Sequence, residues 1–129
     1  MISTLQAFLI TAAREKQEKE IRIGERFPEP FTIRALSMNE WEEIQKKSTD
    51  PEAAKRVDGL GMLRRVAIEG CINPDFKSEE FLGQLGVATS MQGLEKALKA
   101  GEVTRLANSI LKFSGFAEDV EKARKEAQD

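Results

Sequence analysis

The stretch KEIRIGERFPEPFTIRALS, residues 19–37, decides the fold class, because its apolar residues recur with a period of two. Ile21 and Ile23 alternate with charged residues, and the run over residues 31–35 alternates in the same way. Such alternation is typical of strands that bury one face. The two prolines between the runs cannot donate hydrogen bonds to a strand ladder, so they belong to the connection. The stretch therefore predicts a two-stranded β-hairpin joined across residues 24–30.

An isolated hairpin is marginally stable in water, so this one needs helices or another chain to cover it. Upstream of the hairpin, apolar residues recur at positions i, i+3, i+4 and i+7, which indicates one face of a helix. These residues are Leu5, Phe8, Leu9 and Ala12. Ser3 or Thr4 is placed to cap the start of this N-terminal helix.

Downstream of the hairpin, two capping boxes predict two helices. The pair Ser37 and Glu40 starts a helix that ends near Ser48. The pair of residues 89 and 92, Thr and Gln, starts another, whose apolar face continues until Gly101.

The segment between these two helices carries its own start and stop signals. Asp50 followed by Pro51 predicts a helix with Asp50 as its N-cap. This helix is expected to break or bend at its two glycines, 59 and 61, and to continue to about Cys71. The helix stops before Pro74, because the residue that precedes a proline avoids the helical region.

A short helix is predicted between Ser78, as its cap, and Gly86, as its end. Apolar side chains gather in and just before it, and we expect them to be core residues: Phe76, Phe81, Leu82 and Leu85. If Phe81 is fully buried, its replacement by alanine is expected to lower the free energy of unfolding by ~3–5 kcal/mol.

The clearest helical stripe comes last and consists of Val103, Leu106, Ala107, Ile110 and Leu111. Gly115 is placed to end that helix in the left-handed conformation, with Phe116 folding back. The predicted fold class is therefore α+β and mostly α. We expect an N-terminal helix and a two-stranded β-hairpin packed with four to five short helices. Residues 1–116 are expected to form a single domain, and residues 117–129 a charged C-terminal tail.

The composition argues against several classes of function. Twenty basic and 22 acidic residues give a net charge of −2, whereas nucleic-acid binders usually carry a basic excess. A single cysteine, Cys71, excludes an internal disulfide and fits a reducing cytosol. The apolar N-terminal stretch is too short to span a bilayer, which takes ~20 apolar residues. These features predict a soluble cytoplasmic protein that binds neither nucleic acid nor membrane.

The sequence offers no pattern for catalysis, a cofactor or a metal ion. It has no histidine, so a Ser-His-Asp or Cys-His arrangement is impossible and zinc lacks its usual ligands. Gly59 and Gly61 form a Gly-x-Gly pair without the remaining residues of a phosphate-binding loop. Cys71 lies on an apolar helix face and is expected to be an inert core thiol. We therefore expect no enzyme and no cofactor.

A succession of motifs resembles the XkdN-like tail assembly chaperones of phages and phage-like elements in Gram-positive bacteria. It consists of TLQAFL at 4–9, FTIRALSMNEWEEIQKK at 31–47, INPDF at 72–76, LGQLGV at 82–87 and LEKALKAGEVTRLANSILKFSGF at 94–116. The last segment is similar to the family's helix–Gly-Glu–helix that ends in Gly-Phe, here Gly101, Glu102, Gly115 and Phe116. Many relatives have an aromatic residue before the Gly-Val pair, where this chain has Leu85.

The resemblance implies a cytoplasmic chaperone that binds the long, largely helical tape-measure protein, helps tail tube subunits assemble around it and is absent from the mature particle. Two alternatives remain: a structural tail or baseplate component retained in the particle, and a DNA-binding helical domain. Leu5, Phe8 and Leu9 are the first candidates for partner binding, since a terminal helix undocks more readily than an internal one. Ile21 and Ile23 are the second candidates, because an exposed strand edge pairs with other chains. The alternative for both sets is packing against the protein's own core.

Overall fold

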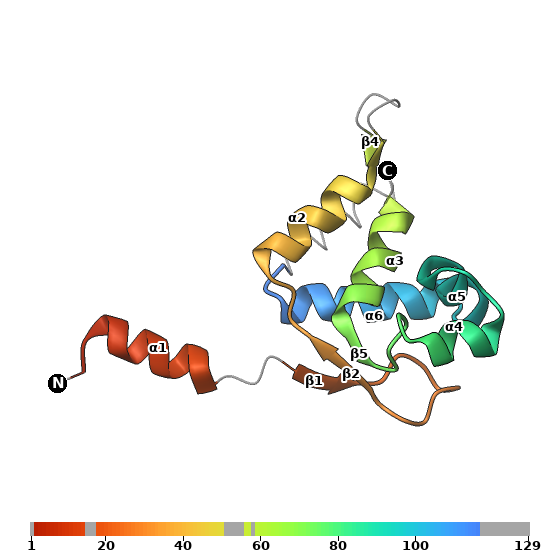
Figure 1. Cartoon of the computed structure of the whole chain (residues 1–129). Coiled ribbons are helices and arrows are strands. Elements are labelled where there is room, and N and C mark those ends of the chain that lie inside the picture. The colour runs from red at the N-terminus through yellow and green to blue at the C-terminus, as the bar shows by residue number, and fades with distance from the viewer. Residues whose placement is uncertain (1, 15–17, 51–55, 58, 117–129) are drawn as a thin grey trace.

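The computed structural model describes residues 2–14, 18–50, 56–57 and 59–116, and Figure 1 shows their arrangement. Along these residues the elements follow in the order α1 (Thr4–Arg14), β1 (Glu18–Ile21), β2 (Phe31–Arg34), α2 (Met38–Lys47), β3 (Thr49–Asp50), β4 (Arg56–Val57), α3 (Gly59–Gly70), β5 (Cys71–Asn73), α4 (Glu79–Leu85), α5 (Ser90–Ala97) and α6 (Ala100–Phe113). The predicted fold class, α+β and mostly α, is confirmed.

The predicted hairpin is present as part of a three-stranded antiparallel sheet with the order β1-β2-β5. In the hairpin, Glu18 pairs with Arg34 and Ile21 pairs with Phe31. The third strand, β5, was not predicted, because the sequence suggested a helix continuing to about Cys71. Instead α3 ends at Gly70 and the next three residues pair with β2. Three residues are too few to show an alternating pattern, and their partner strand lies far away in the sequence.

The segment after α2 also differs from the prediction. Asp50 does not cap a helix but lies in β3, which pairs with β4 in a small two-stranded sheet. Pro51 lies outside the described residues. Helix α3 begins at Gly59, so both glycines fall in its first turn and do not interrupt it.

The predicted caps are confirmed where the signal is local. Ser37 and Glu40 form a capping box at α2, Thr89 and Gln92 form another at α5, and the Ser78 side chain caps α4. Gly86 and Gly115 end α4 and α6 with φ values of 66° and 93°. Helix α5, however, ends at Ala97, earlier than predicted, and Gly101 lies in the first turn of α6.

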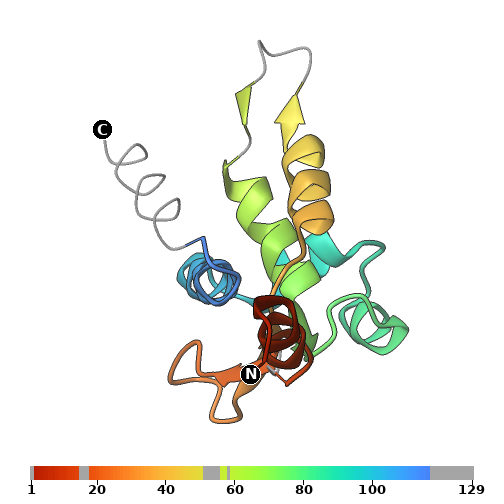
Figure 2. The same cartoon turned by 90° about the vertical axis from the view of Figure 1, so that its left-hand side faces the viewer.

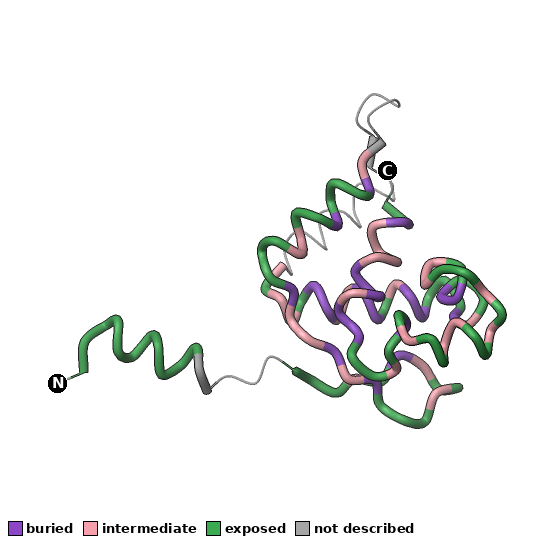
Figure 3. Tube along the Cα trace, viewed as in Figure 1, coloured by how far each residue is buried: buried purple, intermediate pink, exposed green. Residues whose placement is uncertain are grey.

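The core lies where α3 crosses α6, with α2 and α5 packed against α3 and β2 packed against α6. Figure 3 shows the buried residues concentrated along these elements. The predicted stripe of α6 is buried throughout, from Val103 to Leu111. Phe76 is 2% exposed, as expected of a core residue. Phe81, Leu82 and Leu85 are only half-buried, because the short α4 lies at the side of the body.

Within the described residues, no helix combines the length and the apolar character needed to cross a bilayer.

Candidate partner-binding surface

Helix α1 stands apart from the body of the molecule as an arm in Figure 1, and in Figure 2, which is viewed from that side, it lies in front of the body. Its start is capped locally: the Gln6 N–H donates to Ser3 Oγ at 3.1 Å, and the Ser3 N–H donates to Gln6 Oε1 at 3.0 Å. These reciprocal bonds satisfy two N–H groups at the start of the helix without any tertiary contact. The arm is therefore an autonomously capped helix.

The apolar side chains of the arm are turned to solvent. Leu5, Phe8 and Leu9 are 65%, 64% and 53% exposed, and none of them joins the core cluster. We call these three residues the α1 stripe. The structure thus decides against the alternative that this helix closes the protein's own core. Exposed apolar surface gathered on one element is typical of an interaction site.

The length and charge of α1 strengthen this interpretation. The helix has 11 residues, and isolated helices shorter than ~12–15 residues are marginal in water. Residues 4–13 include no charged side chain, although charged residues make up 33% of the chain. A short amphipathic helix gains most of its stability by packing against another surface.

The second candidates for partner binding, Ile21 and Ile23, are more buried than the α1 stripe. Ile23 is 1% exposed and belongs to the core, so its side chain offers no surface to a partner, and that assignment needs correction. Ile21 is half-buried and packs against the same core. The rest of β1, Glu18 to Glu20, is exposed and charged, and charged residues on an edge strand discourage pairing with another chain. The hairpin is therefore the weaker candidate.

The thiol of Cys71 is not a candidate for chemistry. Its side chain is buried, as the sequence predicted, and burial raises the pKa of the thiol to about 12. The thiolate is the reactive form, so this cysteine is a poor nucleophile at neutral pH. Among the described residues, no group of three or more His, Cys, Asp or Glu side chains is placed to hold a metal ion.

An ion pair that the sequence did not reveal fixes the loop after β1, with the Glu102 side chain 8% exposed and the Arg26 side chain 44% exposed. Arg26 donates to both oxygens of Glu102 at 2.6 Å and to the Ala97 carbonyl at 2.8 Å. The Lys99 N–H also donates to Glu102, at 2.7 Å. The sequence did not indicate this pair, because Arg26 lies 76 residues away from its partner. Glu102 was noted only as part of the Gly-Glu pair in the last motif. The pair ties the loop to the corner between α5 and α6.

Two carboxylates predict that acid destabilises the folded protein. They are the carboxylate of Glu102, which Arg26 binds, and that of Glu40, which Arg34 binds. Their hydrogen bonds to arginine lower the pKa of each carboxyl from 4.5 to about 2. A lowered pKa stabilises the folded state above the unfolded-state pKa, and this contribution is lost as the pH falls through the folded-state pKa. We therefore expect the free energy of unfolding to decline between pH 4.5 and pH 2.

Urea denaturation at a series of pH values measures this decline. The double variant Glu40→Gln/Glu102→Gln is expected to be less stable at pH 7 and to lose less stability on acidification. Parallel pH profiles for the variant and the wild type would contradict this assignment of the two carboxyls.

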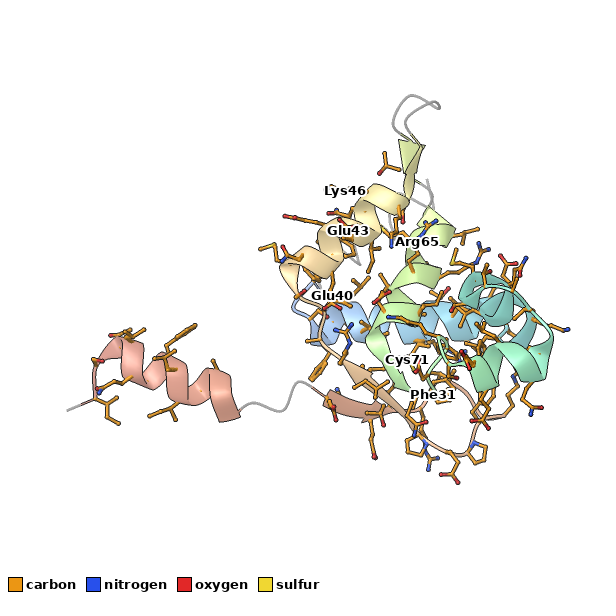
Figure 4. All side chains as sticks on the ribbon, in the orientation of Figure 1. Phe31, Glu40, Glu43, Lys46, Arg65 and Cys71 are labelled. Carbon is orange, nitrogen blue, oxygen red and sulfur yellow. The ribbon has the colours of Figure 1, made fainter. Side chains whose placement is uncertain are left out.

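Grooves lie between the helices of the described part of the body, among them the following two. The first lies between α2 and α3, with a volume of ≈ 380 Å³. Charged side chains line it, with Glu40 and Glu43 projecting from α2 and Arg65 from α3 (Figure 4). The second lies between α3, α5 and the start of α6, with a volume of ≈ 230 Å³ and a mostly apolar lining. We call it the α3–α6 groove.

Comparisons with known proteins agree with the succession of motifs. A family model for the phage XkdN-like tail assembly chaperone protein matches residues 5–128. The phage-like element PBSX protein XkdN of Bacillus subtilis (strain 168) is 26% identical over 141 residues, covering 97% of this chain and 93% of that protein. The uncharacterized protein YqbN of the same strain is 23% identical over 138 residues, with coverage of 97% and 93%.

The crystal structure of the protein YqbN has the same fold. Its TM-score is 0.69 at 21% sequence identity, over 90% of this chain and 99% of that one. Because the family model spans nearly the whole sequence, this chain belongs to the family of phage XkdN-like tail assembly chaperone proteins.

Proposed function

We propose that this protein is a non-catalytic chaperone that binds the tape-measure protein of a phage tail through the α1 stripe and assists assembly of the tail tube. The observation that carries the proposal is the exposure of Leu5, Phe8 and Leu9 on a free arm in a member of a tail assembly chaperone family.

The chemistry of the α1 stripe suits a helical client. An amphipathic helix binds a second helical surface by burying apolar residues spaced i, i+3 and i+4. Leu5, Phe8 and Leu9 have this spacing. A tape-measure protein, which the family resemblance implies to be long and largely helical, needs its apolar faces covered until tube subunits enclose it. A capped helical arm with this apolar stripe supplies such cover and loses little conformational freedom on binding.

We also propose where the chaperone acts and when it leaves the assembling tail. The chaperone acts in the cytoplasm of the bacterial host, with tail tube subunits as further partners, and leaves before the particle is complete. A structural tail or baseplate component would remain. Mass spectrometry of purified mature particles distinguishes the two, since abundant copies of this chain in the particle would contradict the chaperone proposal.

Co-expression with the tape-measure protein of the same phage tail tests the binding surface. We expect an affinity pull-down with the wild type to capture the tape-measure protein. With Phe8→Glu, the amount of captured tape-measure protein is expected to fall at least ~10-fold, because a carboxylate buried without a partner weakens an apolar contact by well over 1.4 kcal/mol.

Met38→Glu is the matched control, since Met38 is an apolar residue of α2 that is 71% exposed on the body. It is expected to capture as much client as the wild type. Equal capture by Phe8→Glu would remove the α1 stripe from the proposal, and failure of the wild type to capture any tape-measure protein would refute the proposal itself.

A further inference from the structure

The groove between α2 and α3, which we call the α2–α3 groove, has an apolar floor and a charged rim. The floor consists of Ile44, Ile68 and Met91, of which the first two are 3% and 8% exposed and the third is half-buried. The volume of ≈ 380 Å³ lies within the ~300–1,000 Å³ that is typical of binding sites. The groove therefore has room for an apolar side chain of a partner, and the rim decides which partners fit.

The end of the groove beside the sheet is electrically balanced. Glu40 and Glu69 line this end. Arg34 donates to Glu40 at 2.8 Å and lies 3.8 Å from Glu69, and Lys77 donates to Glu69 at 2.8 Å. Two carboxylates thus face two cations, so this end does not favour a partner of either charge.

The other end of the groove carries two cations, Lys47 in the last turn of α2 and Arg65 in α3. Figure 4 shows Arg65 higher in the groove than Glu40. Arg65 donates to the hydroxyl of Ser48 at 3.0 Å, which is a neutral partner. Within the described part of the chain, neither Lys47 nor Arg65 forms an ion pair. This end of the groove therefore attracts a carboxylate.

Glu43 adds the opposite charge one turn before Lys47 on α2, and it also lines the groove. Its ion pair with Lys46, at 4.0 Å, joins two exposed side chains, and exposed pairs contribute little to stability. Glu43 is therefore open to a cation of a partner. A helix that fits the groove has a carboxylate facing Lys47, a cation about one turn away facing Glu43, and an apolar residue between them.

This charge order distinguishes the α2–α3 groove from the other apolar surfaces of the protein. In the α3–α6 groove, the lining residues Arg64 and Glu95 form an ion pair with each other at 3.2 Å, so that groove does not select a partner by charge. The α1 arm has no charged residue over positions 4–13. An uncharged helix such as the arm would desolvate the rim of the α2–α3 groove without pairing it.

We propose that the α2–α3 groove is a second docking site for the helical client. It binds a segment in which an apolar residue is flanked by a carboxylate and, about one turn away, by a cation. This inference rests on the proposed function, because the client is the tape-measure protein. The α1 stripe binds apolar helical faces in general, whereas the groove adds selection by charge and sets the direction of the bound helix.

Carbodiimide cross-linking of the full chain with the tape-measure protein, followed by mass spectrometry, tests the location of the contact. The reagent joins an amine directly to a carboxylate that touches it. We expect Lys47 to be linked to an Asp or Glu of the tape-measure protein that has an apolar residue within one helical turn. Client links at lysines elsewhere on the body, such as Lys96 and Lys112, with none at Lys47 would overturn the proposal. So would links from Lys47 to a second copy of this chain.

Charge reversal at Lys47 tests the selection by charge. We expect Lys47→Glu to reduce capture of the tape-measure protein at least ~10-fold in a pull-down, because like charges then face each other in the contact. Lys46→Glu is the matched control. Lys46 precedes Lys47 in the last turn of α2, is 76% exposed and does not line the groove. Both variants lose the same favourable charge at the end of the helix, so their stabilities are expected to match.

The outcomes separate this inference from the proposed function. If the wild type and Lys47→Glu capture equal amounts of the tape-measure protein while Phe8→Glu captures less, the groove is not a docking site and the proposal for the α1 stripe stands. Equal losses for Lys46→Glu and Lys47→Glu would also overturn the inference, since they would indicate a general effect of charge. Failure of the wild type to capture any tape-measure protein would refute both proposals.

Discussion

Replacement of Phe76 by alanine is expected to lower the free energy of unfolding by ~3–5 kcal/mol, a large share of the ~5–15 kcal/mol that stabilises a typical domain. The side chain is 2% exposed. Its ring lies 6.4 Å from the ring of Phe31 in the sheet and 5.2 Å, edge to face, from that of Phe81 in α4. Removing the ring leaves a cavity between Phe31 of β2 and Phe81 of α4. Urea denaturation measures the loss.

Phe8→Ala is the matched control for this prediction, because the same side chain is removed from a position that is 64% exposed. We expect its effect on stability to stay within ~0.5 kcal/mol, as for most surface substitutions. Phe81→Ala is expected to fall between the two, since Phe81 is half-buried and not fully buried. An unchanged denaturation midpoint for Phe76→Ala would contradict its place in the core.

Replacement of Gly70 by alanine is expected to destabilise the protein by ~2 kcal/mol, within the ~1–3 kcal/mol that overpacking usually costs. A Cβ at this position would stand 2.7 Å from Ile110 Cδ1 and 2.9 Å from Ile110 Cγ1. Ile110 is fully buried at the α3–α6 crossing, so its side chain has no space into which to move. Gly70 is thus required for close approach of the two helices. Thermal and urea denaturation check the expected loss.

Gly83→Ala in α4 is a control that is expected to change the stability in the opposite direction. Nothing lies within 4 Å of a Cβ at this position, and Gly83 lies in the interior of the helix. We expect stabilisation by ~0.4–1 kcal/mol, because alanine reduces the freedom of the unfolded chain.

A double-mutant cycle with Ile110→Ala locates the steric conflict. The single change Ile110→Ala is expected to destabilise by ~2–5 kcal/mol, and the added Cβ of Gly70→Ala then fills part of the cavity. The double variant should therefore lose less stability than the two single changes added together. Additive losses would indicate that the strain at Gly70 arises elsewhere.

Local signals predicted much of the secondary structure correctly. Ser37, Ser78 and Thr89 cap the helices that their positions suggested, because each bond joins residues three apart in the chain. Gly115 ends α6 with a left-handed conformation, and the Phe116 N–H donates to the Leu111 carbonyl at 2.8 Å. Interactions this short in sequence do not depend on the rest of the fold.

Signals that depend on distant residues failed. The three residues of β5 have no strand pattern of their own, and they form a strand because they pair with the edge of β2. Asp50 followed by Pro51 has the pattern of a helix start, yet Asp50 pairs with Arg56 in a small sheet. Arg26 and Glu102 each have the sequence pattern of solvated charges, and only the fold brings them together in an ion pair. In β5 and in the Arg26–Glu102 pair a tertiary contact outweighs the local preference, whereas at Asp50 a short-range strand pairing replaces the helix start.

The candidate site shows the same division. The sequence by itself determined that Leu5, Phe8 and Leu9 share one face of a helix, because helical periodicity is a property of the backbone. Only the tertiary structure decided that this face points to solvent while Ile23 enters the core. An apolar stripe has the same pattern whether it is buried or exposed. Burial depends on which surfaces the rest of the chain leaves uncovered, and that is settled by packing.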